Sequence, residues 1–375
     1  MQFVEITVEW SLTTLVFYTA IILGCYTVLL LFRKNSVRWG FGNNNKFLTG
    51  LILVAFALLV VKCFSTTGRD LRTGYLLNFK SATSMAAYRD QTIELGFRVL
   101  MVIVRNLTED YTVFLFVVGL ITVIPVISTI NKYSDRIDVP AAILLFTSIY
   151  FFSGFSAYRQ YMAVSLSLFA FDAIVDRKPG KALGWIAVSS LFHVACLALI
   201  IPYSLFFIRM LTKKMIVISA VVFFILLFLT KDRIALLIGS FERYNIYSVS
   251  ERVSFGMEQV IYYLPMFLLL YICRKNKMDK HMSKIAYIYI LTAFVFGMTG
   301  YIIPIIGRMS SVFIPIIILV PFYIKHYQGH HSKANRLMLG MITIVYCLAR
   351  FIIWITQYYI LEDLMPYTNV FGMVV

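Results

Sequence analysis

The chain has 375 residues, of which 60% are hydrophobic and only 14% are charged, whereas soluble domains hold roughly 45–50% and about 25%. This composition excludes an ordinary soluble protein and predicts a single integral membrane domain over residues 1–375. The net charge of +16 is typical of basic loops that face the inner side of a membrane. Nucleic acid is not expected as a partner, because the chain has no soluble basic domain to bind it.

Apolar runs recur along the whole chain and predict an all-α polytopic protein with about 12 crossings, within a range of roughly 11–14. Short re-entrant or surface helices are expected on its outer face. Arg33 and Lys34 follow the first apolar run, so the positive-inside rule places the N-terminus outside. The expected spans are residues 12–32, 47–64, 111–130, 139–152, 161–175, a hairpin over 182–208, then 215–230, 259–273, 285–303, 309–324 and 337–358.

Two polar stretches fall on the predicted outer side. Residues 65–110 contain one short apolar run and are expected to form an outer loop with a short amphipathic helix. Residues 231–257 form a second outer loop, in which Arg243 lies among acids and tyrosines, a mixture that suits sugar binding or any exposed loop. Basic residues on this side are mostly arginine, whose planar fork clamps phosphate or carboxylate. The alternative is that these arginines snorkel or pair with neighbouring acids.

Arg159 occupies the most informative position. It stands at the centre of a short polar stretch, Ser153-Gly154-Phe155-Ser156-Ala157-Tyr158-Arg159-Gln160, between two apolar runs. The topology places it at the outer mouth of a helix hairpin, where a charge is costly unless something uses it. We therefore expect Arg159 to bind the anionic part of a lipid-linked sugar.

A second group of charges lies on the short apolar helix expected near residues 90–105. Asp90, Glu94, Arg98 and Arg105 fall within an arc of about 80° on a helix. A charged stripe on an apolar segment faces protein, water or a ligand, which predicts the wall of a polar cavity. For Glu94 and Arg98 alone, an internal ion pair at i,i+4 explains the pattern equally well.

His193 is a lone histidine at the predicted apex of the 182–208 hairpin, near the level of Arg159. His193 could carry a proton or donate a hydrogen bond to a phosphate, or it could be a packed histidine bonded to a carbonyl. The sequence leaves both interpretations open. Arg308 enters the span 309–324 and is a further arginine at an outer mouth. No cysteine pair, phosphate loop or zinc spacing is present, so neither a metal nor a cofactor is expected.

At these residues the chain resembles the EpsG family of bacterial membrane proteins, a branch of the Wzy-like O-antigen and exopolysaccharide polymerases. The matching pieces are spread over nearly the whole length. They are Gly68-Arg69-Asp70 with Tyr75, Glu94-Leu95-Gly96-Phe97, Ser153-Gly154 with Tyr158-Arg159-Gln160 and Ala163, Leu191-Phe192-His193 with Ala195, and Arg308. The resemblance implies a GT-C-like helical fold that acts on undecaprenyl-pyrophosphate-linked oligosaccharides. It implies a bacterial inner (cytoplasmic) membrane, with the active site facing the periplasm or exterior.

The residues and the resemblance together give a hypothesis about chemistry. A polymerase joins a chain on one lipid pyrophosphate to a repeat unit on another, so the leaving pyrophosphate needs fixed cations and the attacking hydroxyl needs a base. We assign Arg159 and Arg308 to the pyrophosphate. The candidate catalytic residues are Glu94, His193 and Asp70. The candidate substrate-binding residues are Arg98, Arg105, Arg69, Tyr158, Gln160 and Arg243.

The expected partners are the lipid-linked oligosaccharide donor and acceptor, membrane lipid, and a chain-length regulator and flippase of the same pathway. Two other functions use similar features. A flippase for lipid-linked oligosaccharides also needs an arginine-lined cavity, although it commonly shows a repeat between its halves, which is not found here. A membrane polysaccharide O-acyltransferase is the other alternative.

Overall fold

The computed structural model describes residues 8–35, 48–88, 93–207, 257–274, 278–300, 306–307 and 309–375, together with scattered positions between 215 and 233. This part of the chain is built from helices, with isolated β-bridges only between Ser65 and Asn369 and between Thr368 and Val374. Most of the predicted span 215–230 and nearly all of the predicted outer loop 231–257 lie outside the described residues. Arg243 and Arg308 also lie outside them.

The helices vary widely in length. The long ones are α1 (Leu12–Asn35), α5 (Tyr111–Lys132), α13 (Lys280–Thr299) and α16 (Lys333–Tyr358). Those of intermediate length are α2 (Leu48–Cys63), α4 (Leu95–Leu107), α9 (Pro179–Phe192), α12 (Met257–Cys273) and α15 (Ile316–His330). The short ones are η2 (Leu71–Tyr75), α3 (Leu76–Ser81), α6 (Val139–Phe146), η3 (Thr147–Phe151), η4 (Phe152–Phe155), α7 (Tyr158–Leu166), α8 (Leu168–Val175), η5 (Val194–Leu199), α10 (Ile200–Phe207) and η7 (Met309–Val312).

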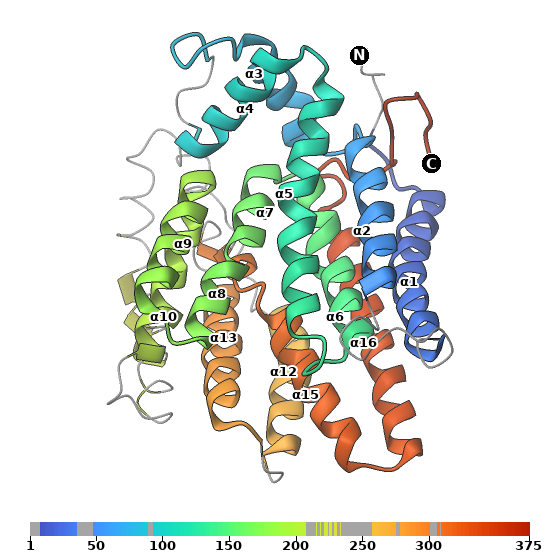
Figure 1. Ribbon diagram of the computed structural model, residues 1–375, viewed down its shortest axis with the longest axis vertical. Helices are drawn as coiled ribbons and strands as arrows, with labels where there is room; N and C mark the ends of the chain where they lie inside the picture. Colours follow the sequence, from blue (N-terminus) through green and yellow to red (C-terminus); the bar gives the residue numbers. More distant parts are fainter. Residues whose placement is uncertain are drawn as a thin grey trace.

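Most of these helices run side by side in one bundle, and a smaller group lies across one end of it (Figure 1). This end group, which we call the cap, consists of η2, α3 and α4 and falls within the predicted outer loop 65–110. The C-terminus lies toward the same end of the bundle as the cap. The turn between α15 and α16 lies at the opposite end.

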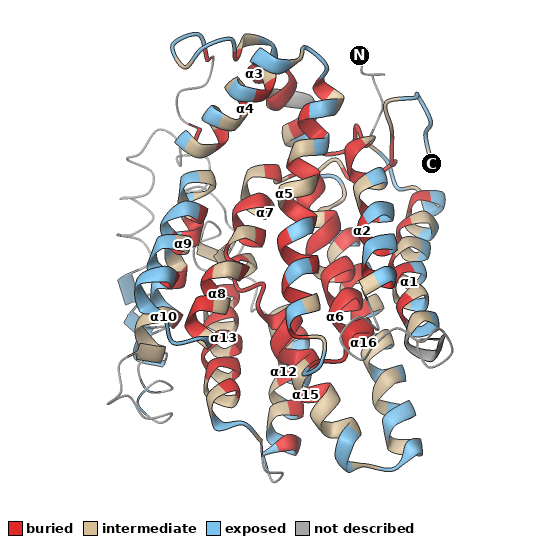
Figure 2. Cartoon of the chain, viewed as in Figure 1, coloured by how far each residue is buried: buried red, intermediate tan, exposed pale blue. Residues whose placement is uncertain are grey.

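Four helices of the described residues are long and apolar enough to cross a membrane, namely α1, α5, α13 and α16. Shorter apolar helices cover Leu48–Cys63, Val139–Phe155, Val194–Phe207 and Glu258–Cys273. Apolar side chains on the outside of the bundle, such as Phe56 at 66% exposure and Val345 at 65%, fit a lipid-facing surface (Figure 2). The protein is therefore a multi-pass membrane protein. The predicted count of about 12 crossings stays a prediction, because several expected spans are broken into short helices.

Two hydrophobic cores meet below the cap. The larger core is centred on α6, whose eight residues are all buried, and on the first half of α15. A helix that is hydrophobic on every face belongs in the interior. The smaller core joins η2, α3, α4 and the start of α5, and it includes Tyr158 and Met162 of α7. Phe192 packs against both cores, so the start of α7 and the end of α9 lie where the two cores meet.

The C-terminal segment after α16 returns to the start of the cap. The backbone N–H of Gly68 donates to the carbonyl of Asp363 at 3.0 Å, and that of Arg69 donates to Glu362 at 3.1 Å. The hydroxyls of Thr66 and Thr368 bond at 2.7 Å. These bonds fix residues 66–69, which lead directly into Asp70 and η2.

Candidate active site

Arg159 is placed by an irregular turn between α6 and α7. The α-helix α6 continues as a π-helix, η3, and then as a 3₁₀-helix, η4, before α7 begins at Tyr158. Gly68 packs against this turn with φ at +117°, and a Cβ atom there would lie 1.9 Å from the carbonyl oxygen of Phe155. Only glycine permits both the conformation and the close approach. Residues 66–69 and the turn are therefore fixed against each other.

Lys62 supports the same turn from inside the bundle. It is fully buried near the end of α2 and its ammonium donates to the carbonyl of Gly154 at 2.7 Å. The ammonium also lies 4.3 Å from the ring centroid of Tyr158 and 5.1 Å from that of Phe155. A buried ammonium is tolerated only with such partners, because it has lost its water. Lys62 thus fixes the backbone just before Arg159.

Glu94 reaches the site because it precedes α4 instead of lying within it. It is the N-cap residue, with φ −58° and ψ 142°. Gly96 then brings α4 onto the end of α9, since a Cβ at this position would be 2.8 Å from the carbonyl oxygen of Leu191. This close packing carries Glu94 to His193, which ends α9. The predicted charged stripe is corrected for Glu94, which lies outside the helix. Asp90 lies outside the described residues, so its place in the stripe stays a prediction.

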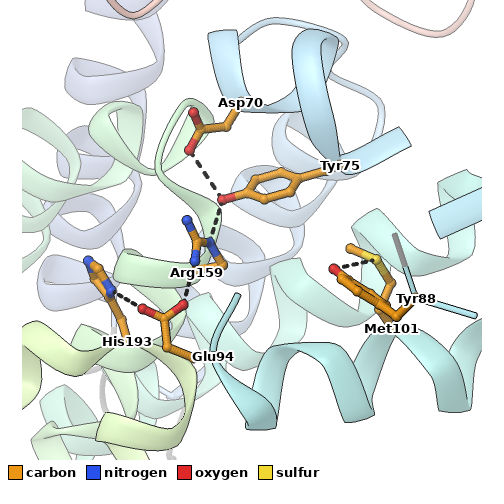
Figure 3. Close-up of polar contacts among 7 residues, drawn as sticks. All are labelled: Asp70, Tyr75, Tyr88, Glu94, Met101, Arg159 and His193. Carbon is orange, nitrogen blue, oxygen red and sulfur yellow. Dashed lines mark hydrogen bonds and ion pairs between the residues drawn. The ribbon is translucent and has the colours of Figure 1, made fainter. Parts of the chain in front are cut away.

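The side chains from these elements form a single chain of polar contacts (Figure 3). The Arg159 guanidinium pairs with one oxygen of Glu94 through Nη1, and His193 Nδ1 lies 3.0 Å from the other oxygen. Arg159 Nε donates to the hydroxyl of Tyr75 at 3.0 Å. That hydroxyl donates to Asp70 Oδ2 at 3.2 Å. Four parts of the chain that are distant in sequence therefore meet at Arg159.

The environment of Glu94 holds it in the ionised form. Burial alone would raise the pKa of this carboxyl group, but the hydrogen bond from His193 and the charge of Arg159 outweigh it and lower the pKa to about 2. An ionised carboxylate only accepts hydrogen bonds, so the proton in the contact with His193 is on Nδ1. Burial raises the pKa of the Tyr75 hydroxyl above its usual range, which keeps it available as a donor to Asp70.

The network leaves two groups with unused bonding capacity. In the described part of the chain, no contact is made by His193 Nε2, which is the accepting nitrogen when Nδ1 carries the proton. Arg159 uses Nε and Nη1, and its Nη2 has no protein partner among the same residues. The side chains of Arg159 and His193 are 20% and 22% exposed, against 9% for Glu94. The site therefore encloses its carboxylate and leaves one acceptor and one cationic edge accessible.

Three other predicted site residues have contacts or burial that the structure describes. Gln160 bonds through Nε2 to the hydroxyl of Ser311 in η7, which links α7 to the segment that follows Arg308 in sequence. Arg98 is half-buried on α4, one turn after Glu94. Arg69 is exposed and directs Nη1 to the carbonyl of Leu361 at 3.5 Å.

Tyr158 and Arg105 do not have the surroundings expected of substrate-binding residues. Tyr158 is only 1% exposed, because its ring lies under the turn and against the Lys62 ammonium. Arg105 pairs with Glu109, one turn further along at the end of α4, with 2.9 Å between Nη2 and Oε1. In the described structure Tyr158 packs under the turn, and its role in substrate binding stays a prediction. Arg105 as a substrate-binding residue remains an untested prediction.

Sequence reasoning assigned no role to Lys62 or Tyr75, although both hold the site together. Lys62 follows Val60 and Val61 in an apolar run, and the rule that singled out Arg159 applies equally to it. Tyr75 entered only as part of the family resemblance and was given no role, because a tyrosine is unremarkable in an aromatic-rich chain. In the described residues, no group of three or more His, Cys, Asp or Glu side chains is arranged to hold a metal ion.

Comparison with known proteins identifies one relationship. The model of a family described as the EpsG family matches residues 47–369, which is most of the chain. No curated protein and no solved structure matches the chain. The matched region includes all five residues of the contact network around Arg159.

Proposed function

The chain belongs to the EpsG family, whose members are Wzy-like polymerases, and on this premise we propose that it joins lipid-linked oligosaccharide repeat units by glycosyl transfer. The donor is an oligosaccharide on undecaprenyl pyrophosphate, and the lipid pyrophosphate is the leaving group. The reaction takes place at the outer face of the bacterial inner membrane, on the side of the cap. Family membership itself supports a membrane protein of polysaccharide synthesis. The donor, the leaving group and the side of the membrane belong to the proposal.

His193 is the base in this reaction and Glu94 is the residue that orients it. A carboxylate with a pKa near 2 is a weak proton acceptor. Glu94 also uses both of its oxygens, one for His193 and one for Arg159. By accepting the Nδ1 proton it fixes the imidazole so that Nε2 is free to take a proton. The arrangement is the carboxylate–imidazole pair that serves many acyl-transfer enzymes.

Arg159 stabilises the leaving group. Tyr75 and Glu94 hold its guanidinium on two sides, and Nη2 remains for a phosphate oxygen. A fixed cation in a partly desolvated site costs little reorganisation when charge develops on the leaving oxygen. Because Glu94 neutralises part of this charge, a second cation is needed for a pyrophosphate. Arg308, Arg98 and Arg105 are the candidates from sequence, with Gln160, Arg69 and Arg243 as candidates for the sugars.

The chemical step balances without another reactant. A hydroxyl oxygen of the acceptor sugar forms a bond to the anomeric carbon of the donor sugar. The bond between that carbon and the pyrophosphate oxygen breaks, and its electron pair stays on the pyrophosphate near Arg159. The hydroxyl proton moves to His193 Nε2. Asp70 acts on this step only through Tyr75 and Arg159, which makes it a positioning residue.

One observation carries the proposal. A single buried carboxylate, Glu94, holds the imidazole and the guanidinium together, and each keeps one unused group on the accessible side. A base and an anion-binding cation at a fixed separation are what transfer from a pyrophosphate donor requires. A packed histidine or a structural ion pair would satisfy only one of these two features.

The direct test in cells is the intermediate that accumulates when the protein is removed. We expect single repeat units on lipid pyrophosphate, accessible to a membrane-impermeant label on the outer side, together with loss of long polymer. Repeat units trapped on the inner side would identify a flippase instead. Polymer of normal length that lacks acyl groups would identify an O-acyltransferase. The expected independence from metal is tested with purified protein and lipid-linked repeat units. Adding a chelator should leave the amount and length of the polymer unchanged.

A further inference from the structure

Arg350 is a second enclosed arginine, in a different part of the bundle. It lies on α16, one of the four helices able to span a membrane, and eight residues before the end of that helix at Tyr358. At 1.5 Å per residue this places it roughly 12 Å from the helix end along the axis. The side chain is half-buried. An ionisable residue at this depth needs a partner or a function.

The surroundings of Arg350 are aromatic. Its guanidinium carbon lies 4.5 Å from the ring centroid of Tyr262 and 5.6 Å from that of Tyr263, both on α12. Nη1 donates to the hydroxyl of Tyr346 at 2.9 Å, and this hydroxyl in turn donates to the carbonyl of Tyr262 at 2.7 Å. Three tyrosines thus fix the guanidinium between α16 and α12.

Among the described residues, Arg350 has no acidic partner like that of Arg159. Within the described residues, no carboxylate forms an ion pair with Arg350, whereas Arg159 is paired with Glu94. Aromatic rings attract a cation through their quadrupoles but leave its full charge in place. Besides the bond from Nη1 to Tyr346, the guanidinium interacts with the side chain of Tyr263. The site therefore keeps the positive charge of the guanidinium between the rings.

Tyr262 supplies a second, independent indication of a ligand. It is only 6% exposed, and its hydroxyl is buried with no hydrogen-bond partner among the described residues. Burying a hydroxyl without a partner is unfavourable. The next residues toward lipid on α12, Ile261 at 52% and Leu264 at 49% exposure, are apolar. Tyr262 and Arg350 therefore lie beside a surface that lipid chains contact.

We propose that Arg350 and Tyr262 form an oxyanion site between α16 and α12 that binds the phosphate of a membrane lipid. The guanidinium supplies the charge and the N–H groups that Tyr346 and Tyr263 do not use, and the Tyr262 hydroxyl supplies a further donor. An anion that reaches this depth beside apolar side chains is carried there by an acyl or polyisoprenyl chain. A phospholipid and a polyisoprenyl pyrophosphate share this chemistry. Binding requires no glycosyl transfer, so failure of this site and failure of the proposed function are separate results.

The test is a titration of purified protein in a neutral detergent with phosphatidylglycerol and, separately, with undecaprenyl pyrophosphate, followed by native mass spectrometry. We expect Arg350→Gln to weaken binding of one of the two lipids at least tenfold. Arg336→Gln is the matched control, because Arg336 is exposed on the same helix and undergoes the same change of charge. Its affinity for both lipids should equal that of the wild type.

The lipid whose affinity falls identifies the source of the phosphate. If neither affinity falls in Arg350→Gln, the arginine is held by its tyrosines alone and the proposal is wrong. Tyr262→Phe keeps the ring beneath the guanidinium and removes only the hydroxyl, so it provides a test even if Arg350→Gln does not fold. We expect Tyr262→Phe to weaken binding of the same lipid about threefold. An unchanged affinity for both lipids would overturn the assignment of Tyr262. If Arg350→Gln also does not fold, that result would overturn the whole site.

Discussion

Arg159 and Lys62 are two cations on opposite sides of one turn, and the protein surrounds them differently. Arg159 has a carboxylate partner, a tyrosine hydroxyl and a side chain that is 20% exposed. Lys62 has no exposed surface and is surrounded by a backbone carbonyl and two rings. The difference shows that a buried charge alone does not mark a reactive group. The accessible edge and the partner carboxylate distinguish the cation that can meet a substrate from the one that holds the backbone.

The largest effect is expected from Arg159→Lys. Lysine keeps the charge but has no planar fork, so it cannot bond Tyr75 and Glu94 and still direct a donor to the phosphate. Loss of one such donor lowers rates by about 10²–10³-fold. The length and amount of polymer, measured at matched protein levels, should fall accordingly, while Arg136→Lys on an exposed loop should leave them unchanged. If Arg159→Lys made polymer of normal length and amount, Arg159 would not be the residue that stabilises the leaving group.

The pH dependence of stability tests whether Glu94 is the partner that separates the two cations. Its pKa is lowered from 4.5 to about 2 in the folded protein, so its ion pairs stabilise the fold fully above the unfolded pKa. This stabilisation, up to about 3 kcal/mol, is lost as the pH falls from about 4.5 toward 2. The Tm difference between wild type and Glu94→Gln should therefore shrink as the pH falls below about 4.5. A difference that stays the same from pH 5 down to pH 3 would contradict it.

Gly68→Ala tests the rigidity of the turn that separates the two cations. The added methyl group would meet the carbonyl oxygen of Phe155 in a backbone conformation that alanine disfavours. We expect a destabilisation of about 2–3 kcal/mol, seen as a lower Tm in detergent. Gly74→Ala is the matched control, since a Cβ at Gly74 meets nothing within 4 Å. Equal Tm values for the two variants would show that the cap and the turn are not tightly packed.

Lys62→Met should affect stability more than chemistry, opposite to Arg159→Lys. Methionine fills a similar volume but leaves the Gly154 carbonyl buried without its donor, which costs about 1–3 kcal/mol. The folded fraction should keep most of its polymerising activity per molecule. Thermal unfolding and activity measured on the same purified sample separate the two quantities. A stable but inactive Lys62→Met protein would mean that Lys62 takes part in the reaction.

The smallest effect is expected from Tyr75→Phe. This change removes the hydroxyl between Arg159 and Asp70 and keeps the ring that packs on Phe97 at 5.2 Å. Since Glu94 still holds the guanidinium, the rate should fall by about tenfold, near the lower end for a hydrogen bond to a charged group. The rate with purified lipid-linked repeat units measures it. A loss as large as that of Arg159→Lys would show that Tyr75 has a more direct role.

The sequence located much of the site because three of its residues interrupt apolar runs. Arg159, His193 and Glu94 were selected by the cost of polar groups near a membrane, and the structure brings them together. The pairing of Glu94 was not predictable, because it depends on the start of α4. A helix that began a few residues earlier would have directed the carboxylate along its own surface, toward Arg98. The end of the helix, and not its amphipathic pattern, decides which residue Glu94 meets.

The fold was predictable in class but not in its count of crossings. Long apolar helices such as α5 and α16 follow directly from hydropathy. The expected span 139–152 is not one regular helix, since residues 139–155 change from α-helix to π-helix to 3₁₀-helix before Arg159. Gly68 and Lys62, which are distant in sequence, contact the end of this segment at Phe155 and Gly154. The sequence does not show such contacts.

The central claim is that Glu94 acts through His193, and a double-mutant cycle tests it most directly. Glu94→Gln, His193→Asn and the double variant would be purified, checked for folding, and assayed for the rate of joining lipid-linked repeat units. We predict that each single variant loses about 100-fold or more, and that the double variant loses no more than the worse single variant, because residues that act as a unit are not additive. Losses that multiply in the double variant, or a His193→Asn protein with wild-type rates, would contradict the claim.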